Sequence, residues 1–287
     1  MAYLGTLNTA TSALQSFSQG LNDVGNNIAN VNTTAYKATT ASYSDTFSGL
    51  GVQVTTNSTD YTQGSLVTTG VPTDLAISGN GYFLVQTVAP IGVTGFTSQV
   101  FATRDGNFTL DPNGYFVNAL GYRLMGLDPI VNSSGGTPVC VHSPAPTQAN
   151  TSNTLTVSSV AVDSNGYIQE TLSDGSKAAQ SAISQVLLCK FSSPQNLQGV
   201  GNNLFTNFAA AGPSTVAAIG GVLTPTSNAP GSNGLGTIQS GCVEASNVDL
   251  TTQFTNMIRL QRAFDANAHV VTVTDTLMQT ITDLKRS

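Results

Sequence analysis

Few side chains in this sequence could act as catalysts or metal ligands. The two histidines are His142, in a Pro/Ser/Asn-rich stretch, and His269, in a long segment of helical periodicity. Neither has a second histidine or a cysteine at metal-binding spacing. Asp111 and Asp163 could pair as general acid and base, but each shortly precedes an Asn-Gly step, where carboxylates open tight turns. We therefore predict structural or solvated roles for all four residues.

Other catalytic and cofactor motifs are also missing. The glycine-rich stretches "SGNGYF" and "GSNGLG" match neither a phosphate loop nor a dinucleotide fingerprint. There is no G-x-S-x-G nucleophile elbow. Cys140, Cys189 and Cys242 are an odd number without a C-x-x-C pair, which favours three small buried residues over a disulfide framework or a zinc site. The sequence predicts no enzyme, no cofactor and no metal.

Charge is scarce for a chain of 287 residues, because Asp, Glu, Lys and Arg make up only 8%. An uncharged polar surface suits a subunit covered by its neighbours, and equally a secreted protein with a Thr/Asn-rich surface. The net charge of −6 argues against nucleic-acid binding. No apolar run approaches the roughly 18 residues of a membrane helix, so we expect no membrane insertion. The N-terminus lacks the basic and apolar regions of a cleaved signal peptide.

Residues 1–31 predict a long helix. Apolar side chains repeat at alternating spacings of four and three, the pattern of a coiled-coil seam. Glycines and the near absence of charge make the helix too weak to persist alone, so it needs a partner surface. The predicted N-terminal seam is Tyr3, Leu7, Ala10, Leu14, Phe17, Leu21, Val24, Ile28 and Val31.

Residues 247–287 predict a second long helix, with Ser246 or Asn247 as N-cap and Asp249 near its positive end. The two helices can pair with each other inside one chain or across chains of an assembly. The predicted C-terminal seam is Leu250, Phe254, Met257, Phe264, Ala268, Val271, Leu277, Ile281 and Leu284.

The middle of the chain, residues 72–235, predicts an antiparallel all-β domain. Asn-Gly-Tyr occurs at 80–82, 113–115 and 165–167 between strand-like runs, and Asp105-Gly106 is a further turn candidate. Residues 128–154 and 209–236 predict loop excursions, and residues 32–71 an extended connector. The fold class is therefore α+β, with terminal helices pairing as a coiled coil around a central β-domain.

Three collinear motifs resemble the bacterial flagellar axial proteins, the family of rod and hook subunits. They are "NNIANVNTTAYK" (26–37), "DLAISGNGYFLV" with "TRDGNFTLDPNGYFVNALGYRLMG" (74–85 and 103–126), and the C-terminal helix from 246 to 284. The family usually has glycine where this chain has Ala35, which predicts altered geometry around residues 33–36. The hallmark segment contributes Asn26, Asn27, Ile28, Ala29, Asn30, Tyr36 and Lys37.

The resemblance implies a structural subunit that polymerises with copies of itself into a helical tube, with both terminal helices in the inner tube. "ASYSDTFSGLGVQV" (41–54) is more similar to the hook protein, which transmits motor torque as a universal joint. The distal rod, a stiff drive shaft, is the alternative, since hook proteins usually carry an extra outer domain. The implied partners are other axial proteins at the tube ends (rod, hook cap and hook–filament junction) and the flagellar type III export apparatus. The implied location is the hook or basal body at the cell surface. A secreted β-domain binding module is the more remote alternative.

Overall fold

The computed structural model describes residues 2–46, 51–87, 99–127, 139–140, 157–173, 175, 184–212 and 228–286. The chain divides into two compact units. Unit 1 combines both ends of the chain, Met1–Thr62 and Ser246–Ser287, and unit 2 is Gln63–Ala245. Most of the segment 32–71, expected to be a separate connector, is therefore part of unit 1.

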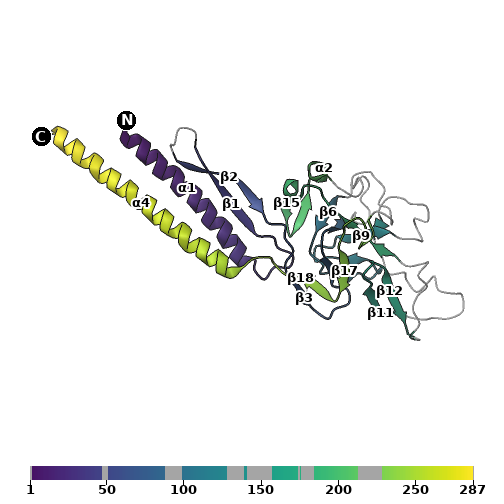
Figure 1. Ribbon diagram of the computed structural model, residues 1–287. Coiled ribbons are helices and arrows are strands. Elements are labelled where there is room, and N and C mark those ends of the chain that lie inside the picture. Colours follow the sequence, from purple (N-terminus) through teal and green to yellow (C-terminus); the bar gives the residue numbers. More distant parts are fainter. Residues whose placement is uncertain are drawn as a thin grey trace. The chain divides into compact units, whose positions relative to one another are not determined.

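Two long helices form the body of unit 1. Helix α1 is Ala2–Ala29 and helix α4 is Leu250–Arg286. They contact each other along their lengths and run antiparallel, with both chain termini at the same end of the pair (Figure 1). At 1.5 Å per residue α4 is about 55 Å long and α1 about 42 Å, so α4 extends beyond α1. Both predicted helices are present.

The start of α4 differs from the prediction in its capping residue. Asp249, not Ser246 or Asn247, precedes the first helical residue. Its carboxylate accepts hydrogen bonds from the backbone N–H groups of Thr251 and Thr252 and from the Thr252 hydroxyl. These bonds, the Thr252 hydroxyl first, lower the pKa of Asp249, as expected for a carboxylate at a helix N-terminus.

A β-hairpin packs on α1, and the sequence did not predict it. Strand β1 (Thr39–Asp45) pairs antiparallel with β2 (Val52–Thr59), inside the segment expected to be an extended connector. Both strands contact α1. Ser, Thr and Asn supply most of their residues, so alternation between apolar and polar positions is too weak to indicate a half-buried strand.

Unit 2 is an antiparallel β-structure, as predicted. Its largest sheet has the order β15-β16-β6-β5-β9-β8-β7, with β10 and β13 also pairing with β9, and β14 with β5. The shorter pairs are β4–β17, β3–β18 and β11–β12. Between β14 and β17 lie a 3-10 helix, η3 (Pro194–Asn196), and a one-turn helix, α2 (Phe208–Ala211). The strands are β3 Leu66–Thr68, β4 Leu75–Ser78, β5 Tyr82–Gln86, β6 Val100–Thr103, β7 Thr109–Leu110, β8 Phe116–Val117, β9 Arg123–Leu127, β10 Val139–Cys140, β11 Val157–Val162, β12 Ile168–Leu172, β13 Gln185–Val186, β14 Leu188–Cys189, β15 Gln198–Gly201, β16 Leu204–Thr206, β17 Thr237–Ser240 and β18 Cys242–Glu244.

Two of the four predicted turns connect hairpin strands. Asp111 opens the β7–β8 turn by accepting bonds from the N–H groups of Asn113 and Tyr115, and Asp163 opens the β11–β12 turn. Their turn assignment is confirmed. The Asn80-Gly81 step joins β4 to β5, and Asp105-Gly106 joins β6 to β7, strands that do not pair with each other. At Gly106 the reason for glycine is a close approach, since a Cβ would lie 1.5 Å from the Leu75 carbonyl oxygen.

The core of unit 2 lies between these strands. It is built from fully buried aromatic and aliphatic side chains, among them Phe83, Phe108 and Phe116. Most of the predicted loops 128–154 and 209–236, including His142, lie outside the described residues. Across the described part of the chain, no helix is long and apolar enough to cross a membrane. Within the same residues, no group of His, Cys, Asp and Glu could hold a metal ion.

Candidate assembly surface

The buried face of α1 is rotated by about one residue from the predicted seam. It consists of small and polar side chains, Ala10, Ala13, Ser16, Gly20, Asp23, Val24 and Asn27. Only Ala10 and Val24 belong to both sets. Of the predicted seam, Leu14, Phe17, Leu21, Ile28 and Val31 are half-buried, Leu7 is exposed, and the side chain of Tyr3 is outside the description. Because α1 packs on both the hairpin and α4, close approach of the backbones selects small residues for the innermost positions.

Helix α4 buries even less of its predicted seam. Its most buried residues are Gln253, Leu260 and Thr274, none of which was predicted. Met257, Phe264, Ala268 and Val271 are half-buried, whereas Leu250, Phe254, Leu277, Ile281 and Leu284 are exposed.

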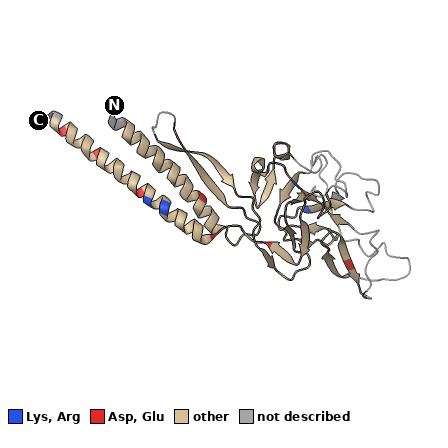
Figure 2. Ribbon diagram, in the orientation of Figure 1, with Lys and Arg blue, Asp and Glu red and all other residues tan. Residues whose placement is uncertain are grey.

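An apolar stripe on α4 therefore faces solvent in the single chain. Toward the C-terminus it comprises Val270, Val273, Leu277, Ile281 and Leu284, which are 44–72% exposed. Charge is sparse on both helices, and Asp23 is the one charged residue of α1 (Figure 2). Apolar side chains spaced along one helix face are typical of a surface that another helix covers.

Polar side chains of α1 hold the hairpin at both of its ends. Near its tip the Ser16 hydroxyl donates to the Val52 carbonyl at 2.9 Å, and the Val52 N–H donates to the Ser12 hydroxyl at 3.2 Å. At the other end Asn27 donates to the Thr39 carbonyl at 2.7 Å and accepts from the Thr39 N–H at 2.9 Å. Both backbone groups of Val52 and of Thr39 are thus satisfied from the helix.

Asn27 also connects the hairpin to α4. It is 1% exposed, its amide nitrogen donates to Gln253 at 3.2 Å, and its amide oxygen accepts from the Tyr36 hydroxyl at 3.2 Å. Four hydrogen bonds therefore converge on one buried amide, the full use of its side chain. This geometry gives a physical role to two hallmark residues, Asn27 and Tyr36, and to Gln253, which was not predicted.

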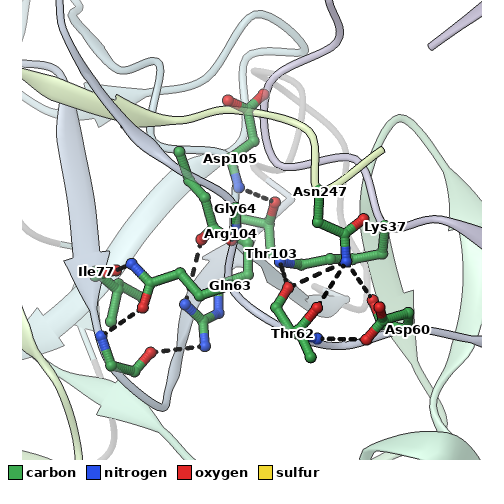
Figure 3. Close-up of polar contacts among 12 residues, drawn as sticks. Lys37, Asp60, Thr62, Gln63, Gly64, Ile77, Thr103, Arg104, Asp105 and Asn247 are labelled. Atoms are coloured by element: carbon green, nitrogen blue, oxygen red, sulfur yellow. Dashed lines mark hydrogen bonds and ion pairs between the residues drawn. The ribbon is translucent and has the colours of Figure 1, made fainter. Parts of the chain in front are cut away.

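A second amide, Asn247, fixes the start of the C-terminal segment. Its oxygen accepts from the Ala38 N–H at 2.8 Å, and its nitrogen donates to the Asp60 carbonyl at 2.8 Å and to Thr62 (Figure 3). Lys37, only 5% exposed, donates to the Thr62 carbonyl at 2.7 Å. Asn247 thus ties the segment after the hallmark residues to the end of β2, a role its side chain could not fill as a helix cap.

The hallmark residues span the last turn of α1 and the segment that follows it. Ile28, Asn30 and Tyr36 are half-buried, while Asn26 and Ala29 are exposed. Ala35 has φ 57° and is 1% exposed. An alanine therefore occupies a left-handed backbone at the position where the family usually has glycine, as expected if this position needs a positive φ. The left-handed region costs an alanine about 1–2 kcal/mol, which the fully buried surroundings must offset.

Unit 2 has its own polar cluster where the chain enters and leaves it. The Arg104 guanidinium contacts the Glu244 carboxylate at 3.2 Å and donates to the Gly79 carbonyl at 2.9 Å. The other Glu244 oxygen accepts from the Gly64 N–H at 3.0 Å. Gln63 donates to the Ile77 carbonyl and accepts from the Gly79 N–H (Figure 3). The Glu244 carboxylate on the exit strand β18 is therefore bonded both to the entry segment at Gly64 and to Arg104 after β6, contacts that no sequence motif indicated.

Burial perturbs two acidic groups of unit 2. It raises the pKa of Glu170 to about 7 and that of the Cys189 thiol to about 12. Glu170 lies on β12 and Cys189 on β14, and both are buried. These shifts come from desolvation and not from an arrangement of acid, base and nucleophile.

Three family models match the chain. The model described as "Flagella basal body rod protein" matches residues 7–37, "Flagellar hook protein FlgE/F/G D1 domain" matches 76–170, and "Flagellar basal body rod FlgEFG protein C-terminal" matches 239–284. The first covers most of α1. The last covers most of α4, all of β18 and half of β17. The middle one covers β5 to β11 and most of β4 and β12.

The proteins similar to this chain are also flagellar rod and hook proteins. The flagellar basal-body rod protein FlgG of Bacillus subtilis is 31% identical over 305 aligned residues, covering 99% of this chain and 100% of that protein. FlgG of Buchnera aphidicola subsp. Baizongia pistaciae is 28% identical and covers 90% of this chain and 91% of that protein. The flagellar hook protein FlgE of Escherichia coli is 38% identical over 152 residues, which cover 51% of this chain and 34% of that protein. The chain belongs to the flagellar rod and hook protein family.

Proposed function

We propose that the chain is a subunit of the distal flagellar rod, polymerising with copies of itself into a stiff helical tube. As a member of the rod and hook family it is a structural component of the flagellum and not an enzyme. The observation that carries the choice of rod is coverage: rod proteins align with the chain from end to end, whereas the aligned hook protein extends far beyond it.

A hook subunit is the second candidate, and it is the function that the sequence resemblance of residues 41–54 favours. One observation favours it: the aligned half of the chain is 38% identical to a hook protein, a higher local identity than to the rod proteins. The alignment leaves about half of this chain and two thirds of that hook protein unmatched, so we rank the rod first.

The exposed stripe of α4 supports self-assembly. Four of its residues are 44–46% exposed: Val270, Val273, Leu277 and Ile281. Because fully burying such a side chain contributes about 1.5–3 kcal/mol, covering the exposed half contributes about 1 kcal/mol each. A neighbouring copy supplies a matching surface, the half-buried apolar residues of α1. An open head-to-tail contact of this kind produces a filament.

The remaining assignments follow from the proposed rod function. The two predicted seams and the hallmark residues are inner-tube contacts, with the helices pairing as a coiled coil. The partners are the axial proteins at either end of the tube and the export apparatus. The location is the basal body.

The test is growth of tubes from purified protein seeded with basal-body fragments, followed by electron microscopy. Full-length chain should extend the seeds as straight tubes, while chains lacking residues 1–31 or 247–287 should not. Ile281→Asp should block growth because it places a charge in the stripe, whereas Leu120→Asp, at a site of similar exposure in unit 2, should not. Curved tubes would assign the chain to the hook. Growth from either truncated chain would refute the role of the helices.

A further inference from the structure

Helix α1, strand β1 and helix α4 enclose a small cavity within unit 1. Its volume is about 40 Å³, and its polar lining includes Asp23, Tyr43, Asn256 and Arg259. One water needs about 10–15 Å³ by this measure, so the cavity has room for about three waters or for a group of similar size, such as a guanidinium head.

The Asp23 carboxylate at this cavity is incompletely bonded. Its Oδ1 accepts one long hydrogen bond from the Asn57 side chain, at 3.3 Å. Its Oδ2 is buried and has no hydrogen-bond partner among the described residues. The residue as a whole is 9% exposed, and burial raises the pKa of Asp23. A buried carboxylate oxygen without a donor is costly, which indicates a missing cationic or hydrogen-bonding group.

An arginine without an ion pair lines the same cavity. Arg259 is exposed, and the ion pairs found among the described residues do not include it. Its charge and that of Asp23 both act on Tyr43: Asp23 raises the pKa of the Tyr43 hydroxyl, after desolvation, and Arg259 lowers it. The two opposite charges therefore flank one tyrosine.

Glycine at position 20 keeps the cavity wall in place. A Cβ there would lie 1.9 Å from the Tyr43 hydroxyl oxygen and 3.3 Å from Leu260. Gly20 lies about one helical turn before Asp23, so the Tyr43 hydroxyl packs against α1 beside the carboxylate. A larger residue would displace the tyrosine and open the site.

We propose that this cavity is a binding site for a single guanidinium group, and that Arg259 of the same chain fills it by pairing with Asp23. A basic group from another molecule is a poorer occupant, because Arg259 already lines the cavity and would repel it. The pair would add a charge-assisted tie between α1 and α4 to the Asn27–Gln253 hydrogen bond, one turn along α1. The pair is not formed in the present structure, so the Arg259 side chain must move to make it.

A double-mutant cycle tests the pairing in the full-length chain. The variants are Asp23→Asn, Arg259→Gln and the two combined, and the readout is hydrogen exchange of residues 250–264. Each single substitution should raise the exchange rate about tenfold, and the double variant should exchange no faster than either. Arg262→Gln is the matched control, since this exposed arginine one turn away does not line the cavity, and it should change the rate less than twofold.

Several outcomes would overturn the proposal. If Asp23→Asn slows exchange, the Asp23 carboxylate is unpaired and destabilises the packing of α1 on α4, and water alone occupies the cavity. If the single effects multiply in the double variant, the two side chains act independently. A charge exchange, Asp23→Arg with Arg259→Asp, should restore protection relative to Asp23→Arg alone, and failure to do so would count against pairing.

The measurement is made both on the chain in solution and on assembled tubes. Non-additive effects of the Asp23 and Arg259 substitutions, in a state where α4 is protected from hydrogen exchange, support the pair. Additive effects in every protected state refute it. Free exchange of α4 in both states would refute it too, because the packing that creates the cavity would not exist. Failure of the unmodified chain to form tubes would refute the proposed function, while the solution measurement would still decide the pair.

Discussion

Replacing Arg104 by methionine should strongly destabilise unit 2. Arg104 is 5% exposed and the Glu244 side chain 0%. At the observed 3.2 Å separation, an effective dielectric constant of 20 gives an attraction of about 5 kcal/mol. Removing one partner of a buried pair costs about 3–5 kcal/mol, because the other charge stays buried without compensation. Arg104→Met should therefore lower the free energy of unfolding by that amount.

The assay is urea unfolding of the full-length chain, followed by tyrosine fluorescence and by hydrogen exchange of residues 63–245. With a urea dependence of about 2 kcal/mol/M, the midpoint should fall by about 1.5–2.5 M. Arg123→Met is the matched control. Its pair with Asp111 is longer, 3.4 Å, and both side chains are partly exposed, 22% and 17%, so we expect a loss of about 1 kcal/mol.

A second variant separates the ion pair from loss of arginine packing. Combining Arg104→Met with Glu244→Leu removes both charges, and should recover at least half of the loss. The reasoning is refuted if Arg104→Met costs no more than Arg123→Met, or if the double variant is less stable than Arg104→Met alone.

Three further predictions concern single sites. Asn27→Asp loses the donor bonds to Thr39 and Gln253, so the free energy protecting residues 36–45 from hydrogen exchange should fall by about 2–4 kcal/mol. The exposed control Asn26→Asp should change it by less than about 0.5 kcal/mol, and equal effects would contradict the bonding role of the Asn27 amide. The folded-state pKa of Glu170, about 7, lies above its ordinary 4.5. Its contribution to the free energy of unfolding, about 3 kcal/mol, is therefore fully present below pH 4.5 and is lost as pH rises through 7. Glu170→Gln should flatten this slope in urea unfolding, and an unchanged slope would contradict the assignment. Cys189 is buried and its pKa is raised to about 12 by burial, whereas Cys242 is half-buried. Iodoacetamide at pH 8 should therefore label Cys242 at least a hundredfold faster than Cys189, as measured by peptide mass mapping. Similar rates would show that β14 opens readily.

Local pattern was sufficient for the elements that carry their own signal. The helices at both ends and the strands around "YFLVQ" and the Asn-Gly turns follow from periodicity and turn chemistry, which depend on residues close in sequence. The turn roles of Asp111 and Asp163 follow from the same short-range hydrogen bonding, as does the family resemblance from its motifs.

Tertiary structure decided which faces are buried and what the polar residues do. The heptad pattern of α1 marks its apolar stripe, but the hairpin competes with α4 for the helix, so Ala13, Ser16 and Gly20 lie innermost and the apolar seam is half-covered. The sequence marks Asn27 as a hallmark residue and Asn247 as a possible cap, but it does not indicate their hydrogen bonds. The partners of Asn27 are 12 and 226 positions away, and those of Asn247 are 187 and 209 positions away. The Arg104–Glu244 pair spans 140 positions. Such contacts depend on where the chain returns in space, which no window of neighbouring residues contains.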